Sequence, residues 1–262
     1  MANAYHHYSI GRHTLNDLAL RYGCSTKTLR RHFDQHKSSV SPPKISHEPV
    51  ALTFDGTFFG RGYGLMIYRA SGRNIFWQEM ASETLAVTEQ GLHHLTAQGW
   101  CFSSITIDGR KGTVSLIKLL LPAAPIQLCL FHQKAIVRRY LTSKPKTLCG
   151  KEIQTLILFL VFIDEALFLE CLSGIKEEYK DFLKERNEQG QFKHRKIRSA
   201  LRSLTTNEPY LYTWQRCPEL KIPTTTNSCD GSFAHWKNKV KIHRGLSKKR
   251  RTQMINHLLA KS

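Results

Sequence analysis

Two aspartates stand at equivalent places in the sequence, each at the end of a short apolar run and each followed by glycine. Asp55 follows Val50–Phe54, and Asp108 follows Phe102–Ile107. One such Asp-Gly is usually a plain turn, but ligand sites in α/β sheets gather at the carboxyl ends of strands. Two carboxylates meeting there would repel each other unless a hard divalent cation such as Mg²⁺ lay between them. The pair therefore predicts phosphodiester chemistry that uses two Mg²⁺ or Mn²⁺ ions.

A third carboxylate completes this set. Asp230 is the single acidic residue in residues 221–262, and it stands at the start of an expected helix over Asn227–Lys239. In that position it either caps the helix, because the helix dipole favours negative charge there, or supplies the remaining metal ligand. The residue types alone leave both alternatives open.

Three motifs carry a resemblance to a known family. The first is the run Ile222–Gly231, followed by His235-Trp-Lys and Ile242–Arg250. The second is the pair of Asp-Gly strands, and the third is Cys129-Leu-Phe-His132, a Cys-x-x-His sequence after the second aspartate. With the helices before the first strand, they make nearly the whole chain resemble bacterial insertion-sequence transposases of the Mutator-like superfamily.

The resemblance implies a ribonuclease-H-like catalytic core in which Asp55, Asp108 and Asp230 are the catalytic residues and metal ligands. It places Cys129 and His132 beside the site as supporting residues. It also implies metal-dependent cleavage at transposon ends, followed by strand transfer into target DNA. Two alternatives stay open: a transposase-derived DNA-binding protein that has lost catalysis, and a nuclease on the same core that cuts without joining.

The elements that must position these residues follow from the apolar periodicity. Strands are expected at 50–54, 64–69, 74–79, 102–107 and 126–130, the first three antiparallel. Helices are expected at 83–98, at 112–121, from Gln133 onward, and throughout 151–216. The order of these elements predicts an α/β fold with helices packed on a mixed sheet, preceded by a small helix-turn-helix. The resemblance implies that the sheet is ribonuclease-H-like and carries an all-helical insertion. The predicted domains are a helix-turn-helix domain over 1–36, a linker over 37–49, the first part of the core over 50–132, the insertion over 133–222, and the end of the core with a basic tail over 223–262.

The helix-turn-helix is predicted at residues 14–33. Thr14 is a cap for the first helix, Gly23 suits the turn, and Ser25 or Thr26 caps the second helix. The second helix presents Lys27, Arg30 and Arg31, as expected of a helix that enters the major groove. An ordinary helical hairpin is the alternative.

The charge points to a polyanionic partner. The 262 residues include 39 Lys and Arg against 20 Asp and Glu, a net charge of +19. Residues 221–262 hold ten of these cations and one acid. Such a field attracts nucleic acid, and the resemblance implies that the partner is double-stranded DNA, as transposon ends and target. The predicted phosphate contacts in this region are Lys237, Lys239, Lys241, Arg244, Lys248, Lys249, Arg250 and Arg251.

The remaining features set limits on compartment and chemistry. Seven irregularly spaced cysteines without a Cys-x-x-Cys pair argue against a disulfide framework and a zinc ribbon; Cys129 with His132 as half of a zinc site is the minor alternative. The longest apolar run, 156–163, is too short to span a bilayer. We expect a cytoplasmic, nucleoid-associated homo-oligomer without a membrane partner. Trp214 is expected either in the core or stacked on an unpaired base.

Overall fold

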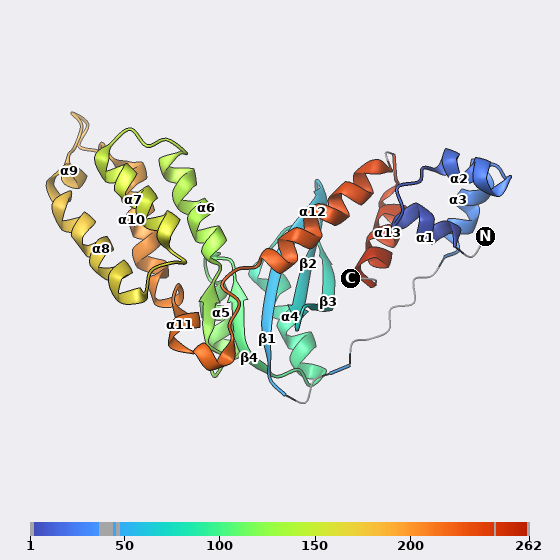
Figure 1. Ribbon diagram of the computed structural model, residues 1–262, viewed down its shortest axis with the longest axis horizontal. Coiled ribbons are helices and arrows are strands. Elements are labelled where there is room, and N and C mark those ends of the chain that lie inside the picture. Colours follow the sequence, from blue (N-terminus) through green and yellow to red (C-terminus); the bar gives the residue numbers. More distant parts are fainter. Residues whose placement is uncertain (1–2, 37–43, 46–47, 244, 261–262) are drawn as a thin grey trace. The chain divides into compact units, whose positions relative to one another are not determined.

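The computed structural model describes residues 3–36, 44–45, 48–243 and 245–260, and it leaves the side chains of Asp230, Ser232 and Ala260 undescribed. The chain is an α/β protein whose strands form one mixed five-stranded sheet in the order β3-β2-β1-β4-β5 (Figure 1). The strands are β1 (Val50–Gly60), β2 (Tyr63–Ala70), β3 (Arg73–Met80), β4 (Phe102–Ile107) and β5 (Ile126–Leu128). No helix within the described ranges joins enough length with enough apolar character to span a bilayer.

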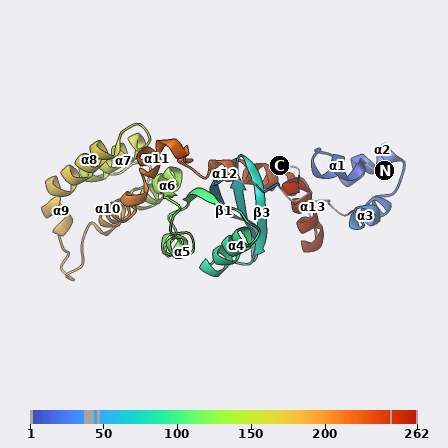
Figure 2. The same ribbon diagram turned by 90° about the horizontal axis from the view of Figure 1, so that it is seen from below.

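Contacts divide the chain into two compact units, one of residues 46–55 and 84–227 and the other of residues 1–45, 56–83 and 228–262. In the first unit, β1, β4 and β5 run parallel. Their apolar side chains, such as Leu52 and Ile105, are fully buried, as expected of a parallel sheet that is covered by helices. Helices α4 (Leu85–Ala97) and α5 (Thr113–Leu120) lie side by side (Figure 2).

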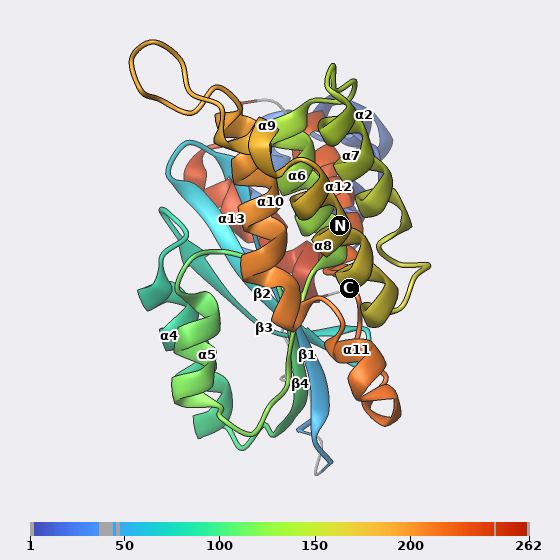
Figure 3. The ribbon, with the colours of Figure 1, turned by 90° about the vertical axis from the view of Figure 1, so that its left-hand side faces the viewer.

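The helices that follow β5 are α6 (Leu130–Leu141), α7 (Leu148–Phe159), α8 (Glu165–Glu178), α9 (Lys180–Lys184), α10 (Arg195–Asn207) and the short α11 (Thr213–Arg216). α10 packs along both α6 and α7, and α8 packs on α7 (Figure 3). The side chains of Thr147 and Asp164 cap α7 and α8. The expected insertion is thus a bundle of helices joined to the carboxyl end of β5.

The prediction of helix throughout 151–216 is wrong over residues 185–194. Arg186 and Phe192 form an antiparallel bridge there. Between them, the Asn187 side chain accepts hydrogen bonds from the backbone N–H groups of Gln189 and Gln191, and Gly190 has a φ of 74°. Asparagine and glycine favour such turns, and the helical pattern of the flanking residues does not extend through them.

The second unit contains the β2–β3 hairpin, α1 (Ala4–Ser9), α2 (Leu15–Tyr22), α3 (Thr26–Asp34), α12 (Asn227–Ile242) and α13 (Lys248–Ala260). The hairpin turn, Ser71-Gly72, has positive φ at both residues, which matches a two-residue type I′ turn. One apolar core joins helices from both ends of the chain, and it includes Leu18, Leu29, Phe33, Phe233, Trp236, Met254 and Leu258.

α2 and α3 confirm the predicted pair of helices. Thr14 and Asp17 form a capping box at the start of α2, and Gly23 ends it with a left-handed φ of 59°. The Ser25 side chain caps α3, so Ser25 and not Thr26 is the N-cap. Two helices separated by this short turn are therefore encoded locally, by residues with the required capping and backbone properties.

Other predicted boundaries need correction. β1 continues past Asp55 to Gly60, so Asp55 lies within the strand and not at its end. β5 ends at Leu128 because α6 begins at Leu130. Residues 248–260, expected as part of a basic tail, form α13, because apolar side chains on one face of that helix are buried in the core. Most of the predicted linker, residues 37–43 and 46–47, lies outside the described residues.

Candidate active site

Three of the predicted site residues lie in one row across the parallel strands, just after the ends of β4 and β5 and in the middle of β1. The hydrogen-bonded register aligns positions 53, 106 and 127 of β1, β4 and β5. Two positions further along these strands are Asp55, Asp108 and Cys129. Because adjacent strands lie about 4.8 Å apart, the two aspartates are neighbours across β1 and β4, and Cys129 follows across β5.

Residues 223–226, which follow the helical bundle in the chain, are hydrogen-bonded to β4 and to α6 beside this row. The Thr106 hydroxyl of β4 donates to the carbonyl of Pro223 at 2.7 Å. The backbone N–H of Leu130, the first residue of α6, donates to the carbonyl of Thr224 at 2.9 Å. The chain therefore comes back from the helical bundle to the strand ends by way of specific backbone contacts.

This segment places Thr226 beside Asp55 and Cys129. The sequence did not identify Thr226 as a site residue. Its side chain is fully buried. Its hydroxyl lies 3.0 Å from Oδ2 of Asp55, 3.3 Å from Nδ1 of His132 and 3.5 Å from Sγ of Cys129. A hydroxyl has one proton to donate and two lone pairs. The short contact to the carboxylate takes that proton, which leaves the oxygen as the acceptor for a protonated His132.

The electrostatics of the row favour that protonation. The hydrogen bond to Cys129, which is the largest cause, and the charges of Cys129, Asp55 and Asp108 together raise the pKa of His132 to about 9 against the opposing effect of burial. Burial by itself raises the pKa of Cys129, but hydrogen bonds from His132 and Thr226 bring the pKa below its ordinary value. The raised pKa therefore favours a protonated His132 at neutral pH.

The neighbourhood of Asp108 joins the site to the helical bundle. Nε of Arg110 lies 4.0 Å from Oδ2 of Asp108, in a partly exposed ion pair. A Cβ at Gly109 would lie 3.2 Å from Nδ2 of Asn207, the last residue of α10. That amide nitrogen donates to Oε1 of the buried Gln133 of α6 at 2.7 Å. The end of α10 is therefore fixed next to the second carboxylate.

The donor set fits a hard cation. Mg²⁺ takes oxygen ligands and is commonly held by one or two carboxylates, its remaining positions being filled by water and substrate phosphate. Asp55 and Asp108 supply such oxygens. Among the described side chains no group of three His, Cys, Asp or Glu forms a metal site. Asp230, the predicted third ligand, lies in the first turn of α12, and its side chain is outside the description.

The basic residues predicted on α3 are at its surface. Lys27, Arg30 and Arg31 are all exposed, while Leu29 and Phe33 on the opposite face are buried. The apolar face therefore holds α3 in the core of its unit and leaves the cations to solvent.

The predicted cations on α12 and α13 fall into two groups. Lys237, Lys241, Lys248 and Lys249 are exposed. Others bind within the protein: Lys239 donates to the carbonyl of Ile10, Arg250 donates twice to Asp34 at 2.7 Å, and Arg251 donates to a backbone carbonyl at 3.1 Å. Lys239 and Arg250 thus join α12 and α13 to the N-terminal helices, and Arg251 joins α13 to β1. Arg244 lies outside the described residues.

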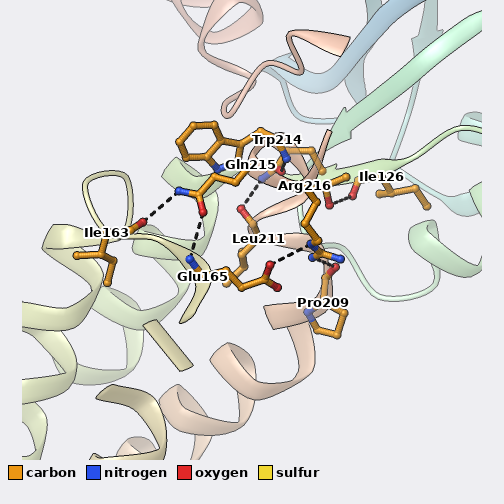
Figure 4. Close-up of polar contacts among 10 residues, drawn as sticks. Ile126, Ile163, Glu165, Pro209, Leu211, Trp214, Gln215 and Arg216 are labelled. Atoms are coloured by element: carbon orange, nitrogen blue, oxygen red, sulfur yellow. Dashed lines mark hydrogen bonds and ion pairs between the residues drawn. The ribbon is translucent and has the colours of Figure 1, made fainter. Parts of the chain in front are cut away.

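Trp214 lies in a polar network that fixes α11 (Figure 4). Its ring is half-buried, and its backbone N–H donates to the buried Gln127 at 3.0 Å. Gln215 bonds to the Ile163 carbonyl and to the N–H of Glu165, and Arg216 forms an ion pair with Glu165 at 3.2 Å. These contacts hold α11 against the start of α8, a few residues before the segment that carries Thr226.

Compared with known proteins, the chain matches no protein-family model and no curated protein.

Proposed function

We propose that this protein is a DNA transposase of the Mutator-like type, which cleaves phosphodiester bonds at transposon ends and transfers the freed strand into target DNA. The observation that carries the proposal is the alignment of Asp55 and Asp108 on neighbouring parallel strands, with Thr226 joining Asp55 to His132. The helical bundle after β5 supports it, because a helical insertion at this point is what the resemblance implies.

In this proposal Asp55 and Asp108 hold Mg²⁺ or Mn²⁺, with Asp230 as the third ligand. The ions supply Lewis-acid stabilisation and activation of the attacking water or hydroxyl. The chain's own residues set the geometry around them. The Thr226 hydroxyl orients the Asp55 carboxylate by donating to Oδ2. The His132 imidazolium holds its proton at Nδ1 toward Thr226 and places a positive charge where the substrate phosphate arrives.

The DNA-binding part of the proposal rests on α2 and α3. Their capped ends and left-handed Gly23 fit a helix-turn-helix, with α3 as the helix that enters the major groove. Lys27, Arg30 and Arg31 are exposed on it. We further propose a homo-oligomer, because transposition must hold two DNA ends together.

The test is a cleavage and strand-transfer assay on DNA that carries the flanking element ends, in Mg²⁺ and in Mn²⁺. The variants are Asp108→Asn, which removes one charge without changing the shape, and Asp230→Glu, which lengthens the third acid. The proposal predicts metal-dependent joined products from the wild type and none from Asp108→Asn.

The other outcomes separate the alternatives. If only Asp230→Glu cuts, the protein is a catalytically decayed transposase. Cutting without joined products identifies a nuclease. If no variant cuts and all of them bind the ends without metal, the catalytic claim fails and a DNA-binding protein remains.

A further inference from the structure

Helix α10 carries three arginines on one face. Its sequence, RKIRSALRSLTTN, contains no acidic residue. Arg195, Arg198 and Arg202 are spaced i, i+3 and i+7, which places them in one row along the helix. The residues that face the other way are buried against the rest of the bundle: Ile197, Ala200, Leu201 and Leu204.

The row lines a cavity of about 430 Å³ between α8, α10 and the 185–194 loop. Its polar lining consists of Lys176, Arg195, Arg198, Ser199, Arg202 and Thr205, and within the described part of the chain no carboxylate lines it. The four cations offer only hydrogen-bond donors, and no counter-charge faces them in this lining. An oxyanion is the ligand that this lining fits.

Arg198 is held in place by a backbone carbonyl and an aromatic ring, and Arg195 donates to the side chain of Gln191 at 3.2 Å. Arg198 donates to the carbonyl of Leu183 at 2.9 Å, and its guanidinium lies over the Phe192 ring at 3.7 Å. Arg186 lies over the same ring at 4.1 Å. A guanidinium has five N–H donors in a rigid plane, so those not used by Leu183 point in a fixed direction. Arg195 and Arg202 flank it and are exposed.

The same helix leads to the candidate active site. α10 ends at Asn207, which lies against Gly109, the residue after Asp108. At about 1.5 Å of rise per residue, Arg202 is roughly 7 Å and Arg195 roughly 18 Å from that end along the axis. Phosphates follow one another by about 3.4 Å per strand along a DNA axis, so the row, about 10 Å from Arg195 to Arg202, spans about three phosphate steps.

We propose that this face of α10 binds the phosphodiester backbone of the DNA strand that leads to Asp55 and Asp108. The inference rests on the proposed function, since it takes DNA as the substrate. It adds a contact surface in the helical bundle to those predicted on α3, α12 and α13. The arginines bind phosphate without reading sequence.

The experiment is a fluorescence-anisotropy titration of a DNA duplex with the full-length protein in EDTA, at several salt concentrations from 50 to 200 mM. The variant is Arg195→Gln/Arg202→Gln. Each phosphate contact adds about 0.9 to the slope of log affinity against log salt. Loss of two contacts lowers the slope by about 1.8, so between these salt concentrations the wild type loses roughly twelvefold more affinity than the variant.

The matched control is Lys144→Gln/Lys151→Gln, which removes two exposed charges from the same unit away from the cavity. The proposal expects its slope to equal that of the wild type, and all three proteins to share one thermal midpoint. It is overturned if the α10 variant keeps the wild-type slope, or if the control changes the slope as much. Since EDTA prevents cleavage, this result is independent of the cleavage assay, in which the transposase proposal can stand or fail separately.

Discussion

Replacing Thr226 by valine tests whether its hydroxyl orients the Asp55 carboxylate. Valine keeps the branched shape of a side chain that is fully buried, and it removes the donor 3.0 Å from Oδ2 of a carboxylate that is itself only 8% exposed. A hydrogen bond to a charged group contributes about 1.5–3 kcal/mol. If that energy holds the carboxylate in its working orientation, Thr226→Val slows cleavage by roughly ten- to 150-fold.

The control is Thr226→Ser, which keeps the hydroxyl and removes one methyl group. It loses about 0.5–1.5 kcal/mol of stability from the smaller apolar side chain, and it should cleave within a few-fold of the wild-type rate. Urea unfolding of both variants separates a loss of folding from a loss of orientation. The reasoning is refuted if Thr226→Val cleaves as fast as Thr226→Ser while both are folded.

Two further predictions concern titration and backbone conformation. The His132 ring should titrate by NMR near pH 9 rather than 6.5, and Cys129→Ala should lower that pKa, because the hydrogen bond to Cys129 is its largest cause. Because folding raises the pKa of His132, protonation of this ring stabilises the folded protein. That contribution is complete below pH 6.5 and is lost as the pH rises through about 9. A ring that titrates at pH 6.5 in the folded protein contradicts this account. Gly23→Ala should cost about 1–2 kcal/mol in a thermal unfolding scan, because Gly23 has a φ of 59°. Gly174→Ala, in the interior of α8 with open space at its Cβ, should instead gain about 0.5–1 kcal/mol; equal shifts for the two would be evidence against the conformational explanation.

The pairing of the two aspartates was predictable because its signals are local. An apolar run that ends in Asp-Gly predicts a strand with a carboxylate near its end, and two such strands in an α/β order predict neighbours. The structure aligns Asp55 and Asp108 across β1 and β4. The continuation of β1 past Asp55 was missed because Asp55-Gly56 is typical of a turn, although the Thr57-Phe58-Phe59 that follows favours a strand.

Thr226 was not predictable from its neighbours in the sequence. It is the last of three consecutive threonines, and nothing in its local sequence distinguishes it from the other two. Its contacts join residues far apart in the chain, so only the folded structure selects it. α13 is the opposite case. Its local sequence does contain the signal, because four apolar residues have helical spacing and are buried: Met254, Ile255, Leu258 and Leu259. The cations that precede them led to the prediction of a basic tail instead of a helix.

The contact between Thr226 and Asp55 has a consequence for how the protein matures on the ribosome. The two residues are 171 positions apart. At about 5–20 residues per second of synthesis, roughly 10–30 seconds pass between their appearance. During that interval the nascent chain holds its first carboxylate without the hydroxyl that orients it. The unit that contains α1 to α3 waits longer still, because its core includes α12 and α13. The row of Asp55, Asp108 and Cys129 and the N-terminal helices thus reach their final surroundings only near the end of translation. A chain that ends before Thr226 lacks both the hydroxyl beside Asp55 and the helices that complete the core around α1 to α3.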